Sequence, residues 1–185
     1  MAFSGLDPEV AEAFDREASA LTAPLSEPLA NELRRTFEPA AKAYHTIVAR
    51  DAWAGHRSWA ERYRSRYDPV VWQRLKRVDE LSAADHAHAD STFAAVRRAW
   101  TEFFADHDFL IIPATPCAAP LKADCTLELR SRLIALTAPA SLGGRPVLTV
   151  PVPLPSGLTT GLQIVVGDAQ SPAIDWLLRH AETKA

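Results

Sequence analysis

A short run rich in aspartate and histidine has the residue types that bind divalent metal ions. It reads Asp85-His86-Ala-His88-Ala-Asp90. On a helix, His86 and His88 would point to different sides, because residues two apart do not share a helical face. Only His86 with Asp90 and Asp85 with His88 could meet, and two ligands are fewer than a protein metal site uses. We therefore interpret this run as a polar helix face and predict no metal site.

The two cysteines and one serine are candidates for nucleophilic chemistry. Cys117 and Cys125 have proline and alanine neighbours and no histidine nearby in the sequence, which favours structural thiols in or near a buried turn. Ser141-Leu-Gly-Gly does not match the Gly-x-Ser-x-Gly pattern of a nucleophile turn, and no base lies beside it in the sequence. The pair Gly143-Gly144 is instead predicted to form a tight turn that feeds a strand over 146–152.

Composition and charge exclude several classes of protein. The net charge of −3 gives no electrostatic attraction to nucleic acid or to an anionic membrane. The 185 residues fit one domain or a piece of a larger one. The sequence contains no apolar run near the roughly 18 residues of a membrane span, and its N-terminal residues do not resemble a signal peptide. With two cysteines only, we expect free thiols and a cytoplasmic protein.

Apolar periodicity, caps and prolines predict helices through residues 1–107. Asp7 is expected to cap the first helix, and Ser82 with Asp85 to form a capping box at the start of a long one. The predicted helices cover 8–21, 29–50 with a kink at Pro39, two short segments within 51–78 that are broken near Asp68-Pro69, and 82–106.

Residues 108–185 are predicted to be rich in strands. About four candidates occur, and three of them are fully apolar and separated by turns dense in Pro, Gly and Thr. Such a composition is typical of strands buried on both faces of a sheet. Ser171-Pro172 should open a closing helix over 171–183. Because so few strands make a poor complete sheet, we expect something else to supply their neighbours.

Four segments carry motifs in a characteristic order. The first, Leu81-Ser-Ala-Ala-Asp-His, is followed by Asp108-Phe-Leu-Ile-Ile-Pro-Ala-Thr-Pro-Cys-Ala-Ala-Pro. Then come Thr137-Ala-Pro-Ala-Ser-Leu-Gly-Gly-Arg-Pro-Val-Leu-Thr-Val-Pro and Gly161-Leu-Gln-Ile-Val. Together they resemble the C-terminal portion of the amidase-signature enzymes, with His86 in place of that family's tyrosine and Ser141 in place of its common asparagine. The resemblance covers nearly the whole chain.

The resemblance implies an α/β fold. Residues 1–185 would form part of an amidase-signature domain, mainly helical over 1–107, followed by a few strands of a mixed sheet and a closing helix. The family hydrolyses amide C–N bonds by acyl transfer, using a nucleophilic serine, a bridging serine and a lysine base. Those residues lie upstream of the matched region, and this sequence has no Gly-Gly-Ser-Ser-like stretch. We assign no catalytic residue and expect no cofactor, and whether the chain is itself an enzyme stays open.

The resemblance also suggests which residues lie near a substrate. By position these are Thr115, Pro116, Thr137 and Ser141, although a purely structural role in turns is an equal alternative. The expected partners are an N-terminal amidase half or a second copy of the chain, with a small-molecule amide only in the complete enzyme. The alternative function is that of a non-catalytic binding or regulatory protein that retains part of the amidase fold.

Overall fold

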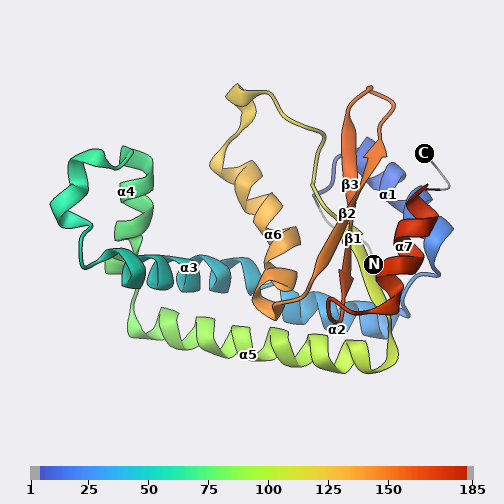
Figure 1. The fold of residues 1–185 in the computed structure, drawn as a ribbon, viewed down its shortest axis with the longest axis horizontal. Helices are drawn as coiled ribbons and strands as arrows, with labels where there is room; N and C mark the ends of the chain where they lie inside the picture. The colour runs from blue at the N-terminus through green and yellow to red at the C-terminus, as the bar shows by residue number, and fades with distance from the viewer. Residues whose placement is uncertain (1–4, 183–185) are drawn as a thin grey trace.

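The computed structural model describes residues 5–182, in which helices enclose a small sheet (Figure 1). The α-helices of this part of the chain are α1 (Pro8–Leu21), α2 (Glu27–Phe37), α3 (Ala40–His56), α4 (Pro69–Lys76), α5 (Ala83–Asp106), α6 (Leu127–Gly143) and α7 (Pro172–Glu182). The short 3-10 helices are η1 (Glu61–Arg66), η2 (Arg77–Glu80) and η3 (Lys122–Asp124), and the strands are β1 (Phe109–Pro113), β2 (Val147–Pro153) and β3 (Thr159–Val166).

The strands form one antiparallel sheet in the order β1-β3-β2, so β3 is central. Helices cover both of its faces, as Figure 1 shows, with α1 and α7 on one side and α5 and α6 on the other. The helices and the small sheet therefore pack into one α/β fold, which confirms the predicted class.

The alternation of side chains along β1 explains why that strand is apolar throughout. Leu110 and Ile112 pack into the core that contains α5 and α6, whereas Ile111 packs into the core beneath α1 and α7. Along β3, Val165 joins the first core and Ile164 the second. Because successive residues of a strand point to opposite faces, burial on both sides favours apolar residues throughout, and the buried Gln163 of β3 is accommodated by donating from Nε2 to Leu136 O at 3.2 Å.

The prediction of double burial is wrong for β2. Its residues alternate between exposed positions and partly or fully buried ones, and the side chains of Val147, Thr149, Pro151 and Pro153 are exposed. Val147 pairs with Val165, so these four residues continue the sheet face that α6 covers elsewhere. We call these four residues the open face of β2.

Two prolines mark β2 as an edge strand. Leu154 N–H donates to Leu158 O at 2.8 Å and Val166 N–H to Pro146 O at 3.1 Å, so the even-numbered residues of β2 direct their backbone polar groups toward β3. The odd-numbered Pro151 and Pro153 therefore face the outer edge, where their missing N–H groups disrupt no pairing with β3. The fourth strand candidate does not form among the described residues.

The predicted helices over 8–21 and 82–106 are confirmed, but the segment between them differs from the prediction. The predicted helix over 29–50 is two helices, because Pro39 ends α2 and begins α3 instead of producing a kink. The chain then continues as α3 to His56, so the helical segments found within 51–78 begin later than expected. They are η1 and α4, which are separated at the predicted break near Asp68-Pro69. Asp68 caps α4 by accepting from the N–H groups of Val70 at 2.8 Å and Val71 at 3.2 Å.

The two predicted caps have different outcomes. Ser82 and Asp85 form the complete capping box of α5. Asp7 occupies the N-cap position of α1 as expected, although its side chain makes no capping hydrogen bond. Its carboxylate instead pairs with Arg132 of α6 at 3.0 Å, which joins two segments far apart in the sequence. The predicted closing helix begins at Pro172 as expected, and its predicted last residue, 183, lies outside the described residues.

Helix α6 was not predicted. Its residues were interpreted as strand and turn because Pro139 and a run of alanine and threonine obscure its periodicity. The predicted tight turn does follow it, since Gly144 ends α6 in the left-handed region with φ of 62°. Just before that turn, Gly143 packs against the fully buried Trp100 of α5, whose Nε1–H donates to Pro139 O at 2.8 Å.

We predict that Gly143→Ala destabilises the fold by about 1–3 kcal/mol. A Cβ atom there would overlap the Trp100 indole, which is buried and has no room to move. Urea unfolding followed by tryptophan fluorescence measures the change. Gly55→Ala is the matched control, because it is an exposed helical glycine with nothing within 4 Å of a new Cβ. Equal stability of the two variants would contradict this account of the contact.

Candidate functional site

The candidate site is a hollow of about 470 Å³ between α6 and the sheet, next to the open face of β2. Its walls come from the segment after β1, from the first half of α6, and from facing parts of β2 and β3. The residues that give it its character are Thr115, Leu129, Leu133, Thr149, Thr159 and Thr160. The site is therefore an apolar hollow with several hydroxyl groups at its wall.

Two of these hydroxyls form an ordered pair. Thr115 Oγ1 donates to the Cys117 carbonyl oxygen at 2.8 Å and lies 3.0 Å from Thr160 Oγ1. Because the single hydroxyl proton of Thr115 is used for the carbonyl, Thr160 must donate to Thr115. The pair holds the segment after β1 against the first residues of β3, and it orients the hydroxyl oxygens at the wall of the hollow.

The structure brings one of the four predicted site residues into the hollow. Thr115 lines it, whereas Pro116 is fully buried and accepts a 2.8 Å hydrogen bond at its carbonyl from Asp7 N–H. Thr137 and Ser141 are on α6, so the alternative of a purely structural role in turns is wrong for these two residues. They follow Leu133 at successive four-residue steps, so they extend its helix face beyond the hollow. Thr137 Oγ1 donates to Leu133 O at 3.2 Å.

Cys117 is the one titratable side chain among the described residues that line this hollow. Burial raises the pKa of its thiol, the Asp7 carboxylate raises it further, and Arg132 partly opposes both effects. A raised thiol pKa disfavours the thiolate at neutral pH, which fits the predicted structural role. The arrangement can bind and orient a small molecule, but the residues at its wall offer neither an activated nucleophile nor a base.

The acidic and histidine-rich run of α5 serves the fold. Asp85 completes the capping box and lies 3.6 Å from Lys42, while Asp90 accepts from Arg50 at 2.9 Å. Both carboxylates therefore have structural partners, in agreement with the interpretation of this run as a polar helix face.

Sequence reasoning missed several residues of the hollow. Leu129 and Leu133 were missed because α6 itself was not predicted, and Thr149 because β2 was expected to be buried on both faces. Thr160 directly precedes the Gly161-Leu-Gln motif. That position was the one available signal, since polar residues that flank a buried strand often form sites.

Comparisons with known proteins agree with this architecture. The family model described as Amidase matches residues 3–171. The chain therefore belongs to the amidase family, whose members carry the amidase signature. A search of curated proteins finds no match.

Solved structures show the same fold. A structure described as an amidase is 27% identical with a TM-score of 0.71, and the match covers 90% of this chain and 40% of that chain. Allophanate hydrolase of Kluyveromyces lactis is 16% identical with a TM-score of 0.79, and the match covers 98% of this chain and 30% of that chain. A structure described as a vestigial protein complex that reveals the origins of an s-triazine catabolic enzyme is 22% identical with a TM-score of 0.71. That match covers 90% of this chain and 37% of that chain. The chain thus spans 30–40% of the length of these proteins.

We predict that Thr160→Val lowers the free energy of unfolding by about 1 kcal/mol, because it removes the hydrogen bond to Thr115 from a site that is 8% exposed. Thr159→Val is the matched control: it makes the same change one residue earlier, at an exposed position. Urea denaturation compares the two. An equal effect of both changes would argue against the hydroxyl pair.

The raised pKa of Cys117 can be tested in a Cys125→Ser variant, in which Cys117 is the one remaining thiol. The pH midpoint of iodoacetamide alkylation should lie above the roughly 8.5 of a free cysteine. Asp7→Asn should lower this midpoint by removing a nearby negative charge, and Arg132→Gln should raise it. Shifts in the same direction for both variants would refute the electrostatic explanation.

Proposed function

We propose that this chain supplies the pocket-covering part of an amidase-signature hydrolase, which hydrolyses amide C–N bonds by acyl transfer. The observation that carries the proposal is the family match over residues 3–171 in a chain spanning only 30–40% of the matched enzymes. In this proposal the hollow is one wall of the acyl pocket. Thr115 would contact the amide substrate, Thr137 and Ser141 would extend the α6 face beside it, and the buried Pro116 would support Thr115 from below the surface.

The catalytic serine pair and lysine would come from an N-terminal half. The sequence has no Gly-Gly-Ser-Ser-like stretch. Its described lysines, Lys42, Lys76 and Lys122, are on α3, on α4 and in η3, and none of them lines the hollow. A lysine base must be near the nucleophile and lose its proton before it can activate a serine. We therefore propose that the chain alone performs no turnover.

The sheet offers a surface for the missing half. The open face of β2 continues the plane of a buried sheet without a covering helix, and Val147 is 38% exposed there. It borders the hollow, so a partner that packs on it would also close the hollow on its open side. Exposed apolar area next to a binding hollow is typical of an interface. We propose an N-terminal amidase half as this partner, in the cytoplasm. The part of the chain that the structure describes contains no helix with the length and apolar character of a membrane span.

We expect the purified chain to show no hydrolysis of simple amides, and a separately produced N-terminal amidase half to bind it and restore turnover. Val147→Lys should weaken that association at least about tenfold by placing a charge in the interface. Val48→Lys is the control, since Val48 is 44% exposed on α3, away from the open face of β2.

Serine-dependent hydrolysis by the chain alone would overturn the proposal that catalysis needs another half. A stable monomer that binds no amidase half would support the alternative, a non-catalytic binding protein that uses the same hollow.

A further inference from the structure

A second concave surface lies on the other side of α6. Two adjoining cavities of about 440 Å³ each share His45, Arg77, Glu80 and Ser131. We call them together the basic groove, and its basic side chains and the serine hydroxyl come from Lys42, His45, Arg74, Arg77, Arg130 and Ser131. These residues come from α3, α4, η2 and α6, so the fold assembles the groove from segments far apart in the sequence.

The basic groove is separate from the hollow beside the sheet. Arg130 and Ser131 line the groove, whereas Leu129 and Leu133 line the hollow. Successive residues of a helix are rotated by about 100°, which places these two pairs on different faces of α6. A ligand in the groove would therefore leave the candidate acyl pocket unobstructed.

Positive charge predominates in the groove. Arg74, Arg77 and Arg130 are exposed, and none of them forms a hydrogen bond or ion pair in the part of the chain that the structure describes. Of the carboxylates, Asp85 is already held by Ser82 and by Lys42 at 3.6 Å. Among the described residues, Glu80 is thus the one carboxylate at the groove without such a partner, and it faces three guanidinium groups. The groove therefore carries a net positive charge.

The arginines also repel one another. Arg74 and Arg77 are three residues apart, a spacing that brings side chains together on one helical face. Arg130 approaches from α6 across the same cavity. Like charges at this spacing are destabilising, and a bound anion would remove that cost. The three guanidinium groups come from three different elements and line one cavity. This arrangement differs from a solvated helix face, where charged side chains of one helix spread into water.

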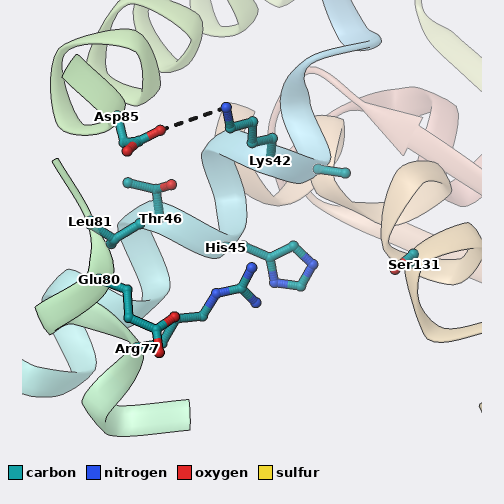
Figure 2. A pocket seen from close by; sticks show the side chains of 9 residues that line it. Lys42, His45, Thr46, Arg77, Glu80, Leu81, Asp85 and Ser131 are labelled. Carbon is teal, nitrogen blue, oxygen red and sulfur yellow. Dashed lines mark ion pairs between the residues drawn. The ribbon is translucent and has the colours of Figure 1, made fainter. Parts of the chain in front are cut away.

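His45 lies within this cluster and has no hydrogen bond among the described residues. Figure 2 shows its ring beside the Arg77 guanidinium, with Ser131 across the same space. Burial lowers the pKa of His45, and the positive charges of Arg77 and Arg130 lower it further. The ring is thus favoured in its neutral form, in which one ring N–H is available to a ligand.

We propose that the basic groove binds a small-molecule anion through a phosphate or carboxylate group. The planar guanidinium forks of Arg77 and Arg130 match the paired oxygens of either group, and Ser131 offers a hydroxyl donor. The exposed Val70 and Leu127 form part of the groove next to these arginines, so an apolar portion of the ligand can lie there. This proposal does not depend on amidase activity.

Calorimetric titration of the full chain with inorganic phosphate, and separately with citrate, tests the proposal. We expect saturable binding of at least one, and the tighter of the two identifies the anion class. Arg77→Gln and Arg130→Gln should each weaken binding about tenfold or more, as expected for loss of a charge-assisted contact. Arg98→Gln on α5 is the matched control, an exposed arginine outside the groove that should leave affinity unchanged.

The titration of His45, followed by NMR, gives a second readout. An anion bound between Arg77 and Arg130 should raise the pKa of His45 and add a proton, so binding should strengthen as pH falls through that pKa. The other charged groups at the groove are Lys42, Arg74, Glu80 and Asp85. Absence of saturable binding, an equal loss of affinity in Arg98→Gln, or an unchanged His45 pKa at saturation would each overturn the proposal.

Discussion

The fold depends on the contact between Trp100 and the end of α6. The indole is fully buried, lies against Gly143 where no Cβ could fit, and donates its N–H to the Pro139 carbonyl. Stacking with Phe104 and packing with Phe37 fix the ring from the α5 and α2 sides. Because α6 is held at this point, its first half can extend along the sheet and separate the hollow on one side from the basic groove on the other.

The same placement determines the chemical character of the hollow. α6 covers β1 and β3 and leaves β2 open, and the hollow forms at that boundary. Its wall consists of apolar side chains and threonine hydroxyls, a chemistry that orients a ligand through hydrogen bonds and excludes water around it. Acyl transfer needs in addition a deprotonated base and an oxyanion hole. The composition of this wall follows from where α6 stops covering the sheet, and in the proposed function the reacting groups belong to the N-terminal half.

The sequence predicted elements where one local signal dominated. The capping box at Ser82 and the apolar stripe through Trp100 gave α5, and the doubly apolar runs gave β1 and β3. Prediction failed where tertiary contacts decide. Pro139 within α6 is tolerated because packing on Trp100 holds the helix, and Asp7 pairs with Arg132, 125 residues away. Of the candidate site, Thr115 could be located from its motif, whereas Thr149 and Thr160 depend on strand register, and the basic groove depends on how four elements meet.

The prolines of β2 limit how this surface can join another chain. Pro151 and Pro153 present carbonyl groups and no N–H groups at the outer edge, which leaves donors only at Val147 and Thr149. A strand added there could form a continuous ladder over the first half of β2 alone. Pairing of two copies of the chain along the full length of β2 is thereby disfavoured. Recognition at this edge would have to be specific, since side-chain fit must replace the backbone pairing that any extended peptide could provide.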